Sequence, residues 1–598
     1  MDGRVRCPES SAEDAGTDRS PASGSGPWTL DTRLLFALDP ELWTLDAPMP
    51  PTHRFIQLTD LHLSDTPGTV TRQALLWAID TVNRYGPDFL AVTGDITTYG
   101  TAASARRFLD ALLRVAVPVR FTPGNAERRS PGAMPVFSDL CDPDRRYILK
   151  DNVLFLFPDT STLDIPEEER RWMDRTVAAH PNAGGCVLIT HCPLESIQTE
   201  SRDWLRRWIA GHRVERLVAG HRHVHRERRI GACQEITTRG LDPDKAAGDL
   251  PGLSLFERSE TGEWSETFIP WAYPLDLLPA DLPHGIPPVG WSIHGDPISA
   301  VRETRELGLS CLELRPRDLD FSTAALKDAL QELRNQRPLY LSYHLPDFTW
   351  NSDGGRIAGQ NRLRAHVACA LEAGVNSLTV HVPRAPAAQM EDGQGHTPLW
   401  KRFLDLYGRL LEGAAAEGVR IAVENLHTPQ GMSADDPDRG FGTEIGEHLR
   451  WIDAISARLP RATVGALLDV GHARNNGHLG NRQPLCDWYA RLGRRILGYH
   501  IHQVHTHPQT GKLANHLEIR TLFGLRISFA GFLRAWSTRQ IARAPLFIEI
   551  RDGGERRRTA RRLKWLFDNA DRLRRSTDLR GKAIQGPGSR VQSKGDQY

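Results

Sequence analysis

Eight short apolar segments recur between Val289 and Asp552, and this repeat constrains the fold of the second half of the chain more than any other feature. The segments are VGWSIHG, SCLELRP, LYLSYHLP, SLTVHVP, RIAVEN, VGALLDVGH, ILGYHIHQVH and LFIEIRD. Each precedes a polar or helix-like stretch, such as 320–336 or 399–418, and the last leads into a basic helix. Eight strand–helix units in such a region are typical of a (β/α)₈ barrel, which takes about 250 residues. We therefore predict a TIM barrel over 289–575.

Six further apolar segments alternate with amphipathic stretches over 52–270, where we predict a separate α/β domain. They are RFIQLTD, FLAVTGD, VRFTPGN, VLFLFPD, CVLITHC and RLVAGH. In most of them a polar motif stands where the strand ends, which is where α/β sheets place their functional loops. Around these domains we expect a disordered leader over 1–27, a Pro-rich linker over 271–288 and a disordered tail over 576–598.

Composition limits the compartment and the partners. The eight cysteines include no CxxC pair, which favours reduced thiols over a disulfide framework. The N-terminus has no apolar signal-peptide core, and no run reaches the roughly 18 apolar residues of a membrane span. The formal net charge is +1, so nucleic acid stays possible but is not favoured. We expect a cytoplasmic protein with no membrane partner.

The polar motifs of the first domain carry metal-ligand types at suggestive spacings. Asp60 and His62 are two residues apart, so both face one way on an extended strand, and His221 and His223 repeat that spacing. The complete set of strand-end donors is Asp60, His62, Asp95, Asn125, His191, His221 and His223. Carboxylate and amide oxygens mixed with imidazoles suit Mn²⁺, Fe or Zn²⁺.

In these motifs, from about Phe55 to His225, the domain resembles the calcineurin-like metallophosphoesterases. The resemblance implies an α/β sandwich with a dinuclear metal centre that clamps a phosphate and activates water for in-line attack. Asp60, His62, Asp95 and His223 would hold one metal, and Asp95, Asn125, His191 and His221 the other. Asp95, Asn125 and His223 would be the catalytic residues.

One position departs from this family. Its members usually carry a histidine after the asparagine, whereas this chain reads GNAER, with Ala126 there and Glu127 in the acidic position. The resemblance gives that histidine the task of protonating the leaving group or steadying the phosphate. Losing such help typically costs about 10²–10⁴-fold in rate. We expect intact metal binding with slow attack on poor leaving groups, and name His225 and Arg222 as possible substitutes.

Ionisable residues also end six consecutive barrel strands, where TIM barrels place their active sites. The candidate metal ligands there are His344, His381, Glu424, Asp469, His472, His500, His516 in a following loop, and Glu549. Such groups would be costly in a barrel interior without a compensating metal or substrate.

These segments, with YHLPDFTWN, VENLH and LLDVGHA, resemble the xylose-isomerase-like barrels and, among them, the endonuclease IV type. By resemblance, Glu424, Asp469, His500 and Glu549 form a core metal site, His344 and His381 join Glu424 around a second metal, and His472 and His516 serve a third. The endonuclease pattern has an Asp where this chain has Ala514, so we expect one to three metals. We prefer His500 to His502 from its spacing to the preceding arginine.

The superfamily supports two chemistries, which leaves alternatives open. A multi-metal site would hydrolyse phosphoesters with Glu424 bridging. A sugar isomerase or epimerase would use Glu424 and Glu549 as acid and base, with His472 and Arg520 steering hydroxyls.

Our leading hypothesis is a two-domain metal-dependent hydrolase, with the phosphoesterase half acting on a phosphorylated small molecule or nucleotide and the barrel on the same or a related sugar-phosphate-like compound. The alternatives are an isomerase barrel beside a first half of reduced or auxiliary activity, and a nucleic-acid phosphodiesterase.

Overall fold

The computed structural model describes residues 53–245, 250–271, 289–392, 395–506, 513–521, 524 and 526–568. The predicted leader, the predicted tail and all but one residue of the predicted linker lie outside these ranges.

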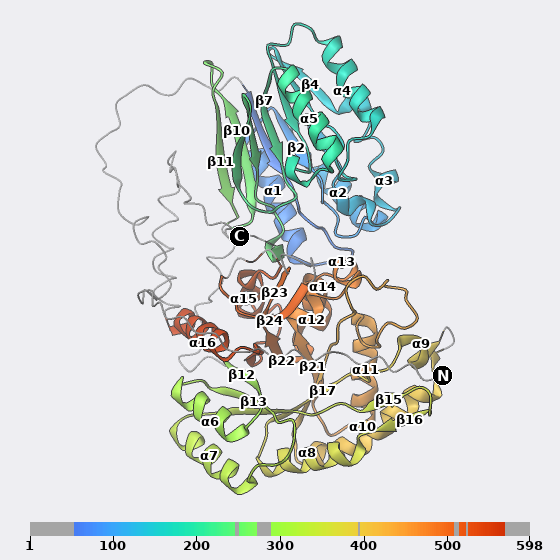
Figure 1. The fold of residues 1–598 in the computed structure, drawn as a ribbon, viewed down its shortest axis with the longest axis vertical. Coiled ribbons are helices and arrows are strands. Elements are labelled where there is room, and N and C mark those ends of the chain that lie inside the picture. Colours follow the sequence, from blue (N-terminus) through green and yellow to red (C-terminus); the bar gives the residue numbers. More distant parts are fainter. Residues whose placement is uncertain are drawn as a thin grey trace, which may run out of the picture. The chain divides into compact units, whose positions relative to one another are not determined.

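The first domain contains two β-sheets (Figure 1). One has the order β11-β10-β1-β2-β3, built from β1 (His53–Leu58), β2 (Phe89–Thr93), β3 (Val119–Thr122), β10 (Gly252–Arg258) and β11 (Trp264–Pro270). The other has the order β4-β5-β6-β7-β9-β8, built from β4 (Tyr147–Lys150), β5 (Val153–Leu156), β6 (Gly185–Ile189), β7 (Val214–Ala219), β8 (Arg226–Ile230) and β9 (Cys233–Thr237). The six predicted segments correspond to β1, β2, β3, β5, β6 and β7, and the remaining strands extend the two sheets.

Alternation along the strands divides the apolar side chains between the faces of each sheet. Phe55 of β1 packs with Phe155 of β5 in a cluster between the sheets. Its neighbour Ile56 faces outward, toward α1 (Val70–Tyr85) and α2 (Ala102–Leu112). Leu188 of β6 lies in the cluster formed with α4 (Glu167–Ala179) and α5 (Thr199–Gly211). The domain is therefore a four-layer sandwich with a helical layer on each outer face.

The second domain is a closed barrel of eight parallel strands in the order β12-β13-β14-β17-β20-β21-β22-β25. The strands are β12 (Val289–His294), β13 (Cys311–Arg315), β14 (Tyr340–His344), β17 (Ser377–His381), β20 (Arg420–Glu424), β21 (Val464–Asp469), β22 (Ile496–Ile501) and β25 (Leu546–Ile548). The longer helices are α6 (Pro297–Glu306), α7 (Thr323–Gln336), α8 (Gln360–Glu372), α10 (Pro398–Ala416), α11 (Ile445–Arg458), α14 (Leu485–Leu492), α15 (Phe529–Ser537) and α16 (Gly553–Asp568). Every one of the eight predicted strands is present, so the predicted barrel is confirmed.

Short insertions decorate the carboxyl ends of the strands. They are the hairpins β15 (Thr349–Asn351)–β16 (Arg356–Ala358), β18 (Glu391–Asp392)–β19 (Gly395–His396) and β23 (Gln503–Thr506)–β24 (Leu513–Leu517), and the helices α9 (Ala387–Met390), α12 (Val470–Arg474) and α13 (Leu479–Arg482).

The barrel interior changes from apolar to ionisable along the strand direction. Its lower layer is a small cluster of Cys311, Ala422, Leu467 and Phe547. Two residues further along, the same strands contribute Glu313, Glu424, Asp469 and Glu549, all buried. Because side chains alternate with a period of two, these carboxylates lie one layer above the apolar floor, toward the carboxyl ends.

The cysteines and the helices can be compared with what the composition predicts. The seven cysteines within the described ranges are all free, and six are buried. Among the helices that the structure describes, none combines the length and the apolar character of a membrane span.

Candidate metal centres

The seven predicted donors of the first domain converge at the carboxyl ends of β1, β2, β3, β6 and β7. Five of them adopt a left-handed backbone conformation that non-glycine residues avoid: Asp60 (φ 53°), His62 (φ 50°), Asp95 (φ 49°), His221 (φ 70°) and His223 (φ 54°). Each such residue costs of order 1 kcal/mol or more, and strain of this kind gathers at functional sites. The fold therefore holds these side chains against a local backbone preference.

One cluster joins Asp60, His62 and His223. His223 Nε2 lies 3.2 Å from Asp60 Oδ1 and 3.3 Å from His62 Nε2. Asp60 Oδ1 is buried and has no hydrogen-bond partner. Electron-pair donors this close, with an orphaned carboxylate oxygen among them, fit a divalent cation.

A second cluster joins His191, His221 and Asn125. His191 Nε2 lies 3.2 Å from His221 Nδ1 and 3.2 Å from the Asn125 amide oxygen. Asp95 belongs to both clusters, because its Oδ1 is 3.4 Å from His191 Nε2 and its Oδ2 is 3.8 Å from His62 Nε2. The geometry brings all seven donors together, with Asp95 in the bridging position.

Glycines and a buried glutamate bring the Asp95 and Asn125 loops into contact. Gly94 (φ 74°) has no room for a Cβ, which would lie 2.2 Å from the Gly124 nitrogen. Glu127 is fully buried and accepts hydrogen bonds from the backbone N–H groups of Asp95, Thr97 and Gly124, each at 2.8 Å. Burial and the nearby Asp95 raise the pKa of Glu127 to about 7. The acidic residue beside Ala126 thus ties the two ligand loops together.

The two residues named as substitutes for the missing histidine have carboxylate partners of their own. His225 lies 3.2 Å from Glu227 and 3.3 Å from Glu266, and Arg222 lies 3.5 Å from Glu195. A different cation, Arg129, reaches the ligand set, with its guanidinium 3.2 Å from the Asn125 side-chain amide.

Lys245 is a second cation near this centre. Its backbone carbonyl lies 3.0 Å from His223 Nδ1, and its ammonium lies 3.7 Å from the Asp242 carboxylate. Burial lowers the pKa of this ammonium to about 8, although Asp242 acts to raise it. The sequence offered no motif that singles out Arg129 or Lys245.

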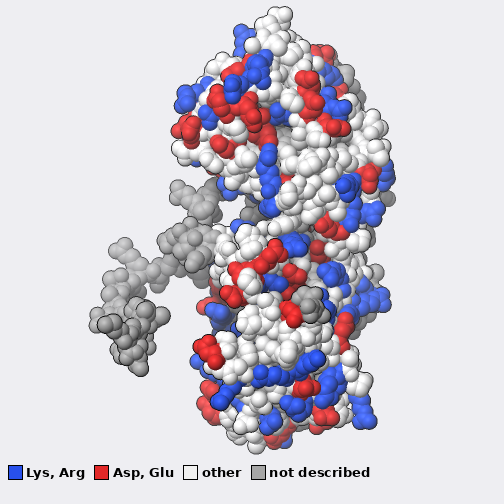
Figure 2. Space-filling view, turned by 90° about the vertical axis from the view of Figure 1, so that its right-hand side faces the viewer, with Lys and Arg blue, Asp and Glu red and all other residues white. Residues whose placement is uncertain are grey.

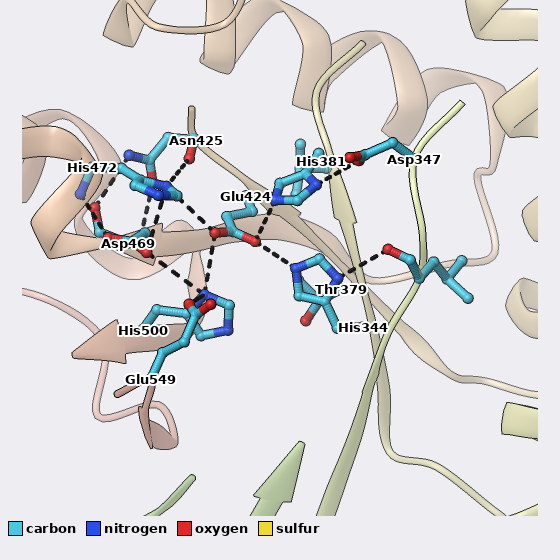
Figure 3. A network of polar contacts seen from close by, with 12 residues as sticks. His344, Asp347, Thr379, His381, Glu424, Asn425, Asp469, His472, His500 and Glu549 are labelled. Carbon is cyan, nitrogen blue, oxygen red and sulfur yellow. Dashed lines mark hydrogen bonds and ion pairs between the residues drawn. The ribbon is translucent and has the colours of Figure 1, made fainter. Parts of the chain in front are cut away.

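In the barrel, Glu424 links two groups of donors (Figure 3). Its Oε2 lies 2.7 Å from His344 Nε2 and 3.0 Å from His381 Nε2. Its Oε1 lies 3.2 Å from His500 Nδ1. His500 Nδ1 is also 2.9 Å from Glu549 Oε2, a buried oxygen without a hydrogen-bond partner. The barrel thus repeats the arrangement of the first domain, with a central carboxylate that has one oxygen in each cluster.

The other predicted barrel ligands border the second cluster. Asp469 begins the short helix α12, accepts from the His472 backbone N–H at 2.7 Å and lies 3.5 Å from the His472 ring. His516 has a left-handed backbone (φ 60°), and its ring centroid is 5.9 Å from that of His472. His516 Nδ1 is 3.8 Å from Glu549 Oε1. Arg520, by contrast, points to Glu518 and Glu555 with a side chain 70% exposed.

Hydrogen bonds distinguish His500 from His502. His500 Nε2 lies 2.6 Å from Glu313 Oε2, so a donating Nε2–H leaves Nδ1 free toward Glu424 and Glu549. His502 Nδ1 accepts from the His516 backbone N–H, so its Nε2–H faces Asp469 at 3.1 Å. This arrangement makes His500 the candidate ligand and His502 a partner of Asp469.

Sequence reasoning missed two buried or half-buried carboxylates. Glu313 is fully buried and accepts from Thr379 Oγ1 at 2.6 Å as well as from His500. Asp347 lies 2.5 Å from His381 Nδ1, on the side away from Glu424. A carboxylate behind a ligating imidazole fixes its tautomer and orientation. Alternation in CLELR could have placed Glu313 inside the barrel.

Burial and neighbouring charges set the protonation of the imidazoles. Burial, followed by the effect of His191, lowers the pKa of His221 to about 4, and burial lowers that of His472 to about 4 despite Asp469. Burial also acts to lower the pKa of His381, but Asp347 and Glu424 outweigh it and raise the value to about 9. Neutral imidazoles are ready to bind a cation, whereas His381 would have to release a proton to do so.

Comparison with known proteins follows the same division. Residues 53–225 match the family model described as calcineurin-like phosphoesterase. Residues 301–569 match the model described as xylose isomerase-like TIM barrel. The chain is a fusion of these two domains. Both families are typically metal-dependent, and both resemblances drawn from the motifs are confirmed.

Solved structures resemble each half separately. A D-tagatose 3-epimerase-like protein is 18% identical, with 48% of this chain and 98% of that chain covered and a TM-score of 0.33. A xylose isomerase-like TIM barrel protein from Mycobacterium smegmatis in complex with magnesium is 14% identical, with 46% and 88% covered and a TM-score of 0.33. The purple acid phosphatase PPD1 from yellow lupin is 11% identical, with 38% and 55% covered and a TM-score of 0.30. No curated protein matches the chain.

Proposed function

We propose that the protein is a two-centre, metal-dependent phosphoester hydrolase acting on a phosphorylated small molecule or nucleotide. The observation that supports this proposal is that each domain has a carboxylate with one oxygen in each of two donor clusters, Asp95 in the sandwich and Glu424 in the barrel. A carboxylate between two donor clusters suits a pair of divalent metals, which clamp a phosphate and activate water for in-line displacement.

In the sandwich, the residues of the chain would hold and neutralise the phosphate. The five candidate ligands with left-handed backbones would keep their positions while substrate binds and product leaves, because the strand ends and Glu127 fix their loops. Arg129 places positive charge beside Asn125, and the Lys245 ammonium, which lies 3.7 Å from Asp242, adds to the effect of burial in lowering the pKa of His62. These cations would steady the negative charge of the phosphate but, unlike a neutral-pH histidine, Arg129 cannot donate a proton to the leaving group.

In the barrel, the contacts of the carboxylates favour hydrolysis over proton transfer on a sugar. Glu549 is held by Arg315 and His500, and Glu424 by His344, His381 and His500. Carboxylates engaged in this way are poorly placed to shuttle a proton at a substrate carbon. The His344 and His381 pair, in turn, is needed for a second metal rather than for an epimerase.

A small substrate is favoured over a duplex nucleic acid. On the face that Figure 2 shows, basic and acidic side chains are interspersed. Duplex binding normally rests on a basic stripe that tracks the phosphates.

Hydrolysis of bis(p-nitrophenyl) phosphate tests the proposal. We expect Asp95→Asn and Glu424→Gln each to remove part of the wild-type rate, with about 10²-fold or greater loss in the centre affected. The exposed Asp110→Asn and Glu412→Gln serve as matched controls. A wild-type protein with full metal content and no turnover of phosphomonoesters or phosphodiesters would contradict the proposal.

A further inference from the structure

A pocket of about 230 Å³ lies beside the first donor cluster of the barrel. His344 and His381 form part of its wall, together with Arg315, Arg317 and Arg362. The pocket therefore borders the side of Glu424 that meets the two imidazoles. A group bound in it would sit next to a phosphate held at the metal centre.

Two of the ionisable side chains in this wall are already paired. Arg315 forms an ion pair with Glu549. Asp347, the acidic residue of the pocket, lies 2.5 Å from His381 and 2.6 Å from Arg384. The charges of Arg315 and Asp347 are therefore balanced by these partners and contribute little to the net charge of the pocket.

Arg317 and Arg362 remain. Arg362 donates from Nη2 to the Arg317 carbonyl at 2.6 Å, which holds the two residues side by side at the pocket. Within the described ranges neither guanidinium has a carboxylate partner within ion-pair distance. Two exposed arginines that line one pocket without an acidic partner suit an oxyanion, which arginine binds in a bidentate manner.

We propose that this arginine pocket, in which Arg317 and Arg362 supply the charge, binds a second phosphate of the barrel's substrate, one that is not cleaved. The inference rests on the proposed phosphoesterase function of the barrel. The pocket is smaller than the roughly 300–1,000 Å³ of common ligand sites, so it accommodates a phosphate with few further atoms rather than a nucleobase. The substrate class is then a small bisphosphorylated compound.

Calorimetric titration of the full-length protein with D-fructose 1,6-bisphosphate and D-fructose 6-phosphate tests this assignment, with phosphate release followed in parallel. We expect the bisphosphate to bind about tenfold or more tightly than the monophosphate, and Arg317→Gln/Arg362→Gln to bring the two affinities close together. Arg461→Gln removes an exposed arginine just before β21, at the opposite end of the barrel, and is expected to retain the wild-type ratio. Added salt is expected to reduce the wild-type ratio and to have little effect on that of the double variant.

Equal affinities in the wild type, or an unchanged ratio in the double variant, would overturn the pocket assignment. The choice of a small substrate would be overturned if the double variant lost more affinity for duplex DNA than for the bisphosphate. If the arginines set the ratio but Glu424→Gln leaves hydrolysis intact, the anion pocket stands and the proposed barrel activity fails. If hydrolysis depends on Glu424 but the arginines do not affect the affinity ratio, the proposed barrel activity stands and the anion pocket fails.

Discussion

At the scale of single residues, Ala126 separates metal binding from proton donation. The seven donors around it are assembled, and Glu127 next to it serves the loops rather than the substrate. The cations of this centre are Arg129, which lies beside Asn125, and Lys245, whose ammonium lies 3.7 Å from Asp242. Under the proposed function, Ala126 would restrict the leaving groups that the site can expel while the candidate ligands stay in place.

Ala126→His is expected to restore a proton donor. The rate on phenyl phosphate, which has a poor leaving group, should rise by about 10²-fold, and that on p-nitrophenyl phosphate much less. Steady-state kinetics on the two esters measure the difference, and Ala126→Gln controls for size. Equal gains on both substrates would show that proton donation is not what the site lacks.

Glu313→Gln tests a positioning role beneath His500. The amide cannot accept from both His500 and Thr379 as the carboxylate does, so the imidazole loses its fixed tautomer. Metal affinity of the barrel should fall about 10–100-fold, measured by competition with a chromophoric chelator. The exposed Glu412→Gln is the control and should keep the wild-type metal affinity. If Glu313→Gln also keeps it, Glu313 has a purely structural role.

At the scale of elements, both centres are built where strands end. The sandwich uses abrupt turns after β1, β2 and β7 that force left-handed backbones on the ligands. The barrel instead keeps most of its ligands on the strands, where alternation places them in one layer. The first centre should therefore depend more on its bound cations for local order than the second.

Metal removal provides the corresponding test. Chelation should lower the melting temperature by roughly 5–15 °C, because a ligand that binds only the folded state stabilises it. Hydrogen exchange should increase most in the loops after β1, β2 and β7, where cations offset backbone strain. Faster exchange confined to the barrel would contradict this view of the first centre.

The elements also show how far sequence reasoning reaches. The eight barrel strands and six sandwich strands were predictable because they are short apolar runs closed by polar motifs. The strand β8, with its sequence RERRI, was missed because its side chains are mostly charged and give no apolar signal. The edge strand β11, with its sequence WSETFIP, was missed because Ser265, Glu266 and Thr267 interrupt its apolar residues. Glu313 was missed because it lies within its strand rather than at the strand end, where the polar motifs stand, although alternation in a closed barrel places it inside.

In the whole molecule, two separate candidate ligand sets lie in one chain, one in each domain. The sequence could not show which of His500 and His502 is the metal ligand, because residues two apart on a strand face the same side. Their hydrogen bonds in the structure distinguish the two imidazoles. Because the bridging carboxylates Asp95 and Glu424 belong to different domains, their substitutions should act additively. The Asp95→Asn/Glu424→Gln double variant should lose the sum of the two single losses in metal content and in activity.

Inductively coupled plasma mass spectrometry of the purified protein measures whether both domains bind metal. We expect about four divalent ions per wild-type chain, two for each of Asp95 and Glu424. Asp95→Asn should lower the content of the sandwich alone, Glu424→Gln that of the barrel alone, and Asp110→Asn neither. A wild-type chain that binds metal in one domain only, with the other empty at saturating Mn²⁺ or Zn²⁺, would contradict the claim.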